Sequence, residues 1–148
     1  MEIRRFGIGQ RRRDGPTGSH NVQAALIESG PAGLIAELAL ARHASIEVHT
    51  NPNTAWFVVI EGGGFVTVGS ERVRVFAGEA VHWPAGIPHG ASTELSEMRA
   101  IVVEFPAEGS GSPVLEGRVS RVLEAGPAEG RLIDERSALY DPRHGEPR

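Results

Sequence analysis

A histidine and a nearby carboxylate are the first residues of this chain whose types and spacing could do chemistry. His49 ends an alternating polar and apolar stretch over residues 45–50, and Glu47 precedes it by two positions. Side chains two apart on a strand share a face, so we expect Glu47 and His49 to point the same way and Ile46 and Val48 to point the other way. A carboxylate facing a protein interior must be paired, hydrogen-bonded or bound to a cation. Glu47 is therefore a candidate metal ligand and, without a metal, a candidate general base.

A second histidine, His89, follows a turn built by Pro84 and Gly86. A neutral imidazole binds a divalent metal or hydrogen-bonds a ligand. Metal sites of this kind use about three protein ligands and leave positions open for water or substrate. We expect His49 and His89 to supply two of them, with Glu47 or Asn51 as the third. Asn51 has an equally good interpretation as a turn residue, because it lies in an Asn-Pro-Asn-Thr stretch.

The segments between these histidines are typical of short strands and tight turns. Apolar runs rich in β-branched and aromatic residues cover 56–60, 65–68 and 72–76, separated by a triple glycine at 62–64 and a Gly-Ser pair at 69–70. Stretches 22–28, 33–41 and 99–105 are further strand candidates. Two histidines so far apart in sequence meet only if the sheet curls back on itself. The pattern therefore predicts a β-barrel with the histidines at its mouth.

The same stretch resembles the conserved core of the cupin superfamily. Its second motif is matched without a gap up to His89, but Thr93 stands where the family has a trailing asparagine. Its first motif is half present, with Asn51 in place of a histidine and Ala55 in place of a glutamate. The resemblance implies an all-β, cupin-type double-stranded β-helix (jelly-roll barrel), in a single domain with a short C-terminal extension. We expect an arm over 1–21, the barrel over 22–106, and a linker with a charged extension over 107–148. The matching positions are His49, Gly62, Gly78, Pro84, Gly86 and His89.

Three further residues are candidates for a ligand pocket. Trp56 and Trp83 are core aromatics in the simplest interpretation, and alternatively wall a cavity with the indole N–H available to a ligand. His82 lies between Val81 and Trp83, and strand alternation leaves open whether it faces the cavity or the outside.

Bulk composition excludes several classes of function. The net charge of −4 argues against a general nucleic-acid binder, and the absence of cysteine excludes disulfides and thiolate chemistry. No apolar run is long enough to span a membrane, so we expect a cytoplasmic protein with no membrane partner. Basic residues cluster in the arm, which indicates either a site for an anionic ligand or a solvated segment. We also expect a homodimer, formed through an outward face containing Ile46 and Val48.

Two functions fit these residues. The first is a small-molecule-binding cupin with one divalent transition metal, among Fe, Mn, Zn and Ni, held by the residues above. As an enzyme it would be of dioxygenase, isomerase or lyase type, and the resemblance does not name the reaction. The second is a metal-free cupin that senses or carries a small ligand, which the two missing motif residues favour. A purely structural barrel is a weaker third, because it gives the histidines no role.

Overall fold

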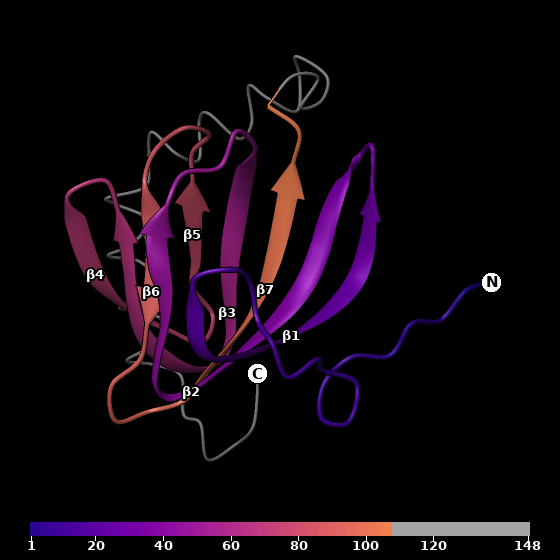
Figure 1. Cartoon of the computed structure of the whole chain (residues 1–148), viewed down its shortest axis with the longest axis horizontal. Helices are drawn as coiled ribbons and strands as arrows, with labels where there is room; N and C mark the ends of the chain where they lie inside the picture. The colour runs from indigo at the N-terminus through magenta and orange to yellow at the C-terminus, as the bar shows by residue number, and fades with distance from the viewer. Residues whose placement is uncertain (108–148) are drawn as a thin grey trace. The chain divides into compact units, whose positions relative to one another are not determined.

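The computed structural model describes residues 1–107, and these form seven β-strands and no helix (Figure 1). The fold is all-β, as the sequence predicts. No helix in this part of the chain is long and apolar enough to cross a membrane. The predicted extension over 107–148 falls, apart from its first residue, outside the described residues. The strands are β1 (Ser19–Gly30), β2 (Gly33–His49), β3 (Thr54–Val68), β4 (Glu71–Phe76), β5 (Ala80–Trp83), β6 (His89–Ser92) and β7 (Met98–Phe105).

Two long strands close the barrel because each of them pairs with more than one neighbour along its length. The first half of β2 pairs with β7 over residues 34–40, and its end pairs with β6 over 45–49. Strand β3 likewise pairs with β7 over 54–62 and with β6 over 65–68. All pairs are antiparallel, and β1 and β4 lie at the two ends of the strand order. A sheet shared in this way wraps around one interior, which is the predicted barrel.

The interior is filled by apolar side chains from nearly every strand. Phe57, Val59 and Leu40 are completely or almost completely buried, and Phe57 stacks on Trp83 with ring centroids 4.8 Å apart. Alternation along β3 puts Ala55, Phe57 and Val59 inward, as expected for a strand with one buried face. The packed apolar core therefore forms a rigid wall beside the histidines.

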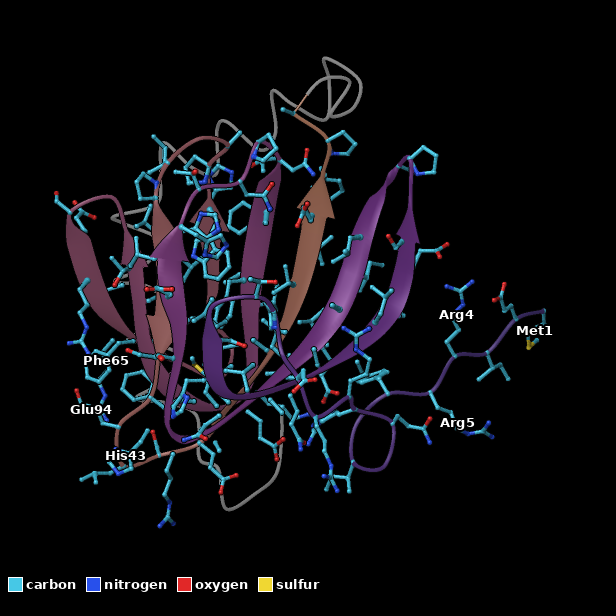
Figure 2. All side chains as sticks on the ribbon, viewed as in Figure 1. Met1, Arg4, Arg5, His43, Phe65 and Glu94 are labelled. Atoms are coloured by element: carbon cyan, nitrogen blue, oxygen red, sulfur yellow. The ribbon has the colours of Figure 1, made fainter. Side chains whose placement is uncertain are left out.

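A buried hydroxyl fixes the point where β2 passes from one pairing partner to the next. Thr93 donates to the carbonyl of Ala41 at 2.5 Å and accepts a hydrogen bond from the amide of Ala44 at 2.9 Å. Between them His43 takes a positive φ of 55°, and its amide donates to the carbonyl of Glu94. His43 and Glu94 lie near each other at the lower end of the barrel in Figure 2. Thr93 thus shapes the bend of β2.

Candidate functional site

The structure brings His49 and His89 together. They are cross-strand neighbours on β2 and β6, and their ring centroids are 4.6 Å apart in a T-shaped arrangement. The ring of Trp83 stacks on His89 with centroids 4.3 Å apart and planes only 19° apart. His89 is 2% exposed, while His49 is exposed at the rim. One imidazole is thus held rigidly by aromatic stacking, and the other lies beside it where solvent and ligands have access.

Backbone carbonyls fix the protonation of both rings. The Nδ1 atom of His49 lies 2.8 Å from the carbonyl of Glu47, and that of His89 lies 3.0 Å from the carbonyl of Ile87. A carbonyl only accepts, so each Nδ1 carries the hydrogen and each neutral ring keeps its lone pair on Nε2. Burial lowers the pKa of His89 against the opposing effects of the Ile87 carbonyl and the Glu104 carboxylate. Burial therefore favours the neutral form of His89.

The expectation that Glu47 shares a face with His49 is wrong. Strand β2 contains a β-bulge, because the four residues of β2 from Ile46 to His49 lie opposite only three of β6, from Ala91 to His89. The extra residue reverses the alternation, so Ile46 and His49 both line the cavity. Glu47 is exposed on the outer surface beside Gly18, and it meets His49 only through its backbone carbonyl. We therefore assign Glu47 neither a ligand nor a general-base role.

The bulge also corrects the predicted outward apolar face. Ile46 is 4% exposed and belongs to the core, whereas Val48 is 51% exposed. Only Val48 of the pair remains available to a partner.

A different carboxylate lines the cavity. Glu104 is the penultimate residue of β7, and strand alternation from the buried Ala100 and Val102 places it on the inner face. It is the direct cross-strand partner of Ala55, the position where the cupin motif has a glutamate. Its Oε1 accepts a hydrogen bond of 2.7 Å from the side-chain amide of Asn53. Sequence reasoning missed Glu104, although the alternation of β7 carried the signal.

Asn51 lies at the cavity but behaves as a turn residue. Its side-chain oxygen accepts a hydrogen bond of 2.9 Å from the amide of Asn53, and its carbonyl accepts one of 2.8 Å from the amide of Gly86. These bonds tie the loop after β2 to the turn that precedes His89. The oxygen that would serve as a ligand is therefore already in use.

The three residues predicted to line a ligand pocket do not lie on the same face. Trp83 lines the cavity, whereas Trp56 and His82 do not. Trp56 and His82 are cross-strand partners on β3 and β5, with ring centroids 5.0 Å apart, and alternation puts them on the face opposite Ala55 and Trp83. His82 is half-buried, which lowers its pKa, and its Nε2 lies 2.8 Å from the hydroxyl of Thr54. This pair contributes to packing outside the cavity.

The cavity has a volume of about 380 Å³, within the range of small-ligand sites. Its walls are mainly aliphatic side chains from β1, β2 and β7. Its polar groups are the imidazoles of His49 and His89, the side chains of Asn51 and Glu104, and the guanidinium of Arg12 from the arm. The lining residues are Arg12, Gly15, Pro16, Ala24, Leu26, Leu34, Ala36, Leu38, Ile46, His49, Asn51, Ala55, Trp83, His89, Val102 and Glu104.

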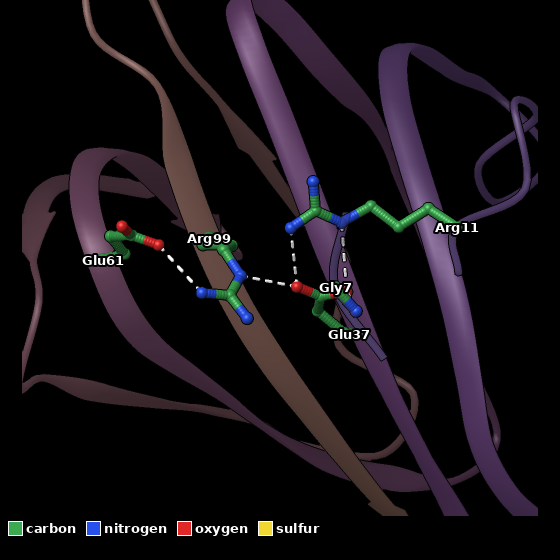
Figure 3. A network of polar contacts seen from close by, with 5 residues as sticks. All are labelled: Gly7, Arg11, Glu37, Glu61 and Arg99. Atoms are coloured by element: carbon green, nitrogen blue, oxygen red, sulfur yellow. Dashed lines mark hydrogen bonds and ion pairs between the residues drawn. The ribbon is translucent and has the colours of Figure 1, made fainter. Parts of the chain in front are cut away.

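A buried ion-pair network lies on the outer face of the same strands (Figure 3). Glu37 of β2 is completely buried and accepts hydrogen bonds from the amide of Gly7 and from the guanidinium groups of Arg11 and Arg99. Arg99 also pairs with Glu61 at 2.9 Å. Hydrogen bonds from Arg11 are the main cause that lowers the pKa of Glu37 to about 2. The network holds the arm against β2.

The side chains present form an incomplete metal site. Two Nε2 lone pairs side by side are suitable nitrogen donors, and carbonyl-held Nδ1–H groups are the usual support for metal-binding histidines. Within residues 1–107, however, no three histidine, cysteine, aspartate or glutamate side chains are placed to hold one ion. The protein groups described therefore supply two donors where about three are usual.

Comparisons with known proteins agree with the barrel fold. Residues 36–104 match the cupin domain family. These residues form a cupin domain. Cupins generally bind small molecules and often hold a metal, but the match does not state either property for this chain. No match was found among curated proteins.

Several solved cupin structures share the fold. A conserved cupin barrel protein from Salinispora arenicola has a TM-score of 0.62 at 19% identity, over 74% of this chain and 92% of that one. The polyketide cyclase RemF from Streptomyces resistomycificus has a TM-score of 0.61 at 19% identity, over 72% and 81%. An RmlC-like cupin from Shewanella frigidimarina has a TM-score of 0.59 at 20% identity, over 72% and 94%. At these identities the likeness establishes the fold alone.

Proposed function

We propose that this cupin binds a small organic molecule inside the barrel, with the ligand's polar group at His49 and His89 and its apolar body against the aliphatic walls. The observation that carries the proposal is the cavity itself, which is mostly apolar and ends at two imidazoles whose Nε2 atoms make no hydrogen bond within residues 1–107. Such a combination of apolar walls and a few fixed polar groups is the usual layout of a small-molecule site.

The imidazoles select for a group that can donate hydrogen bonds. Both Nε2 atoms are acceptors, because both Nδ1 hydrogens are used by carbonyls. A ligand amine can donate to both nitrogens, and a ligand hydroxyl, which has one hydrogen, can donate to one of them. His89 is fixed by stacking on Trp83, so little side-chain freedom is lost when a ligand binds.

Histidine substitutions test this function. We expect a metabolite that raises the thermal midpoint of the wild-type protein to lose its effect in His49→Gln and in His89→Gln. His20→Gln is the matched control, because His20 is exposed and lines no part of the cavity. A ligand that stabilises the histidine variants as strongly as the wild type contradicts binding at the imidazoles.

A divalent metal at the same imidazoles is the second candidate, favoured by the paired Nε2 lone pairs. His49 and His89 would hold the ion, water or ligand oxygens would complete its coordination, and it would act there as a Lewis acid. Elemental analysis of the purified protein tests this. About one ion of Fe, Mn, Zn or Ni per chain, lost in His89→Gln, supports it. A protein that stays empty after incubation with each of these metals overturns it.

A homodimer remains a proposal for this chain. Val48 and several other apolar side chains are exposed on the barrel, among them Val73 and Phe76 of the terminal strand β4. Sedimentation velocity over a range of concentrations tests the oligomeric state, and a protein that stays monomeric at the highest concentration contradicts it.

A further inference from the structure

The amino-terminal arm forms part of the cavity wall. Arg12, Gly15 and Pro16 line the cavity together with Ala24 and residues deeper in the barrel. Arg12 forms an isolated β-bridge with Ala24, in which its amide donates to the Ala24 carbonyl at 2.8 Å and its carbonyl accepts from the Ala24 amide. The arm thus adds one bridge beyond β1 and brings a charged residue to the apolar side of the cavity.

Alternation within the arm assigns two consecutive arginines to opposite faces. Arg11 points to the outer face, where its guanidinium bonds Glu37 at 2.8 Å and 3.1 Å. Arg12 is directly opposite Ala24, and residues opposite each other in an antiparallel bridge share a face. Ala24 lines the cavity, so the Arg12 side chain lies on the cavity side. The Arg11–Glu37 pair therefore positions Arg12.

The charge of Arg12 has no counterpart in the part of the chain that the structure describes. Arg4 pairs with Glu2 and Glu28, and Arg11 and Arg99 pair with Glu37, but Arg12 makes no ion pair and no side-chain hydrogen bond within residues 1–107. The one carboxylate lining the cavity, Glu104, is hydrogen-bonded to Asn53. Arg12 is exposed, so its guanidinium is a cationic donor free to bind a ligand at the open side of a mostly apolar cavity.

A second donor on the cavity wall also lacks an acceptor. Trp83 is 4% exposed, and its Nε1–H is the one buried side-chain polar atom without a hydrogen-bond partner in residues 1–107. A buried N–H without an acceptor costs on the order of 1–3 kcal/mol. The Trp83 Nε1 atom is itself inaccessible, so Arg12 is the donor that a ligand in the cavity can reach, and it favours a ligand that carries oxygen acceptors.

We propose that Arg12 is the residue that selects a small carboxylic acid as the ligand of this cavity, by binding the carboxylate while the apolar body lies along Leu26 and Leu38 and a hydroxyl reaches the imidazoles. The inference rests on the proposed function, since it requires a ligand in the same cavity. A guanidinium binds a carboxylate through two parallel charge-assisted hydrogen bonds, which a neutral amide cannot reproduce. The expected class of ligand is therefore hydroxy acids with an apolar skeleton.

The experiment compares acids with their amides. Matched pairs such as 3-(4-hydroxyphenyl)propionate and its amide, and 6-hydroxyhexanoate and its amide, are titrated by ligand-observed NMR, which detects weak binding. We expect the acid to bind the wild-type protein at least about tenfold more tightly than its amide. Arg12→Gln should remove this preference and leave the affinity for the amide unchanged. Arg12→Lys should restore part of it, because the charge remains but the two-pronged geometry is lost.

Arg13→Gln is the matched control. Arg13 has the same charge and neighbouring position, is exposed, and lines no part of the cavity. It should keep the wild-type preference for acids. Equal binding of acid and amide to the wild type, or an equal loss in the Arg12 and Arg13 variants, overturns the role of Arg12 and leaves the proposed function standing. Absence of any binding that depends on His89 contradicts both.

Discussion

Glu37 ties the arm to the barrel through a charge that has no access to water. It is 0% exposed, and its two oxygens accept hydrogen bonds from Arg11, Arg99 and the amide of Gly7. A buried carboxylate is tolerated only when its partners are complete. Loss of the charge leaves two guanidinium groups next to a neutral side chain, so this residue should be sensitive to conservative substitution.

We predict that Glu37→Gln lowers the free energy of unfolding by about 3 kcal/mol, because breaking a partly buried network leaves its cations unpaired. Glu61→Gln is the control, because Glu61 pairs with the same Arg99 but is exposed, and it should cost less than about 1 kcal/mol. Urea denaturation of both variants measures the difference. Equal losses would show that burial of Glu37 contributes nothing.

The pH dependence of the free energy of unfolding should reflect the protonation of Glu37. The pKa of Glu37 is about 2 in the folded protein against 4.5 for a free side chain. The stabilisation is therefore complete above pH 4.5 and is lost as the pH falls from 4.5 towards 2. Urea midpoints measured across this window should fall more steeply for the wild type than for Glu37→Gln. Parallel curves would contradict the prediction.

Among the elements, the pairing of β2 with β6 determines whether the two imidazoles meet. The bulge between Ile46 and His49 turns His49 inward, and Gly90 lets β6 approach the bulged strand. A Cβ at Gly90 would lie 2.7 Å from the carbonyl oxygen of Ile46. No side chain fits there without moving one strand away from the other.

We therefore predict that Gly90→Ala separates His49 from His89 and destabilises the fold by about 2 kcal/mol, as overpacking does. Gly30→Ala is the control, because a Cβ there meets no atom within 4 Å. Histidine ring NMR shifts report the site, and urea midpoints report stability. Unchanged ring shifts in Gly90→Ala would mean that the strand spacing does not set the imidazole pair.

The strands were predictable from the sequence, but the bulge was not. Apolar runs located β3 and β4, and the motif with Pro84 and Gly86 led to His89. The predicted break at the triple glycine 62–64 was wrong, because β3 runs unbroken from Thr54 to Val68 and its glycines pair with β4 and β7. Simple alternation failed at Glu47, because no residue of the 45–50 stretch marks where an extra residue enters the strand. On β5 alternation left two choices for His82, and the burial of Trp83 against Phe57 decided between them.

For the molecule as a whole, the described barrel contains its own core. The cluster of buried apolar side chains runs from Val22 to Val102, and the same interior provides the cavity wall. A chain of residues 1–107 is therefore expected to fold into the barrel and to unfold cooperatively. Circular dichroism and urea denaturation check this, and a truncated chain without a cooperative transition contradicts it.

The pairing of Ala55 with Glu104 has a consequence for how cupins are compared. The two residues are far apart in sequence, yet they occupy one rung of the ladder between β3 and β7. Strand β3 has an alanine where the cupin motif has a carboxylate, and strand β7 supplies a carboxylate in the same layer of the barrel. A motif defined along a single strand counts the alanine at position 55 as a lost carboxylate. Aligning cupins by barrel layer instead would count acidic groups by location in space, and would separate chains that lack a carboxylate from chains that have relocated it.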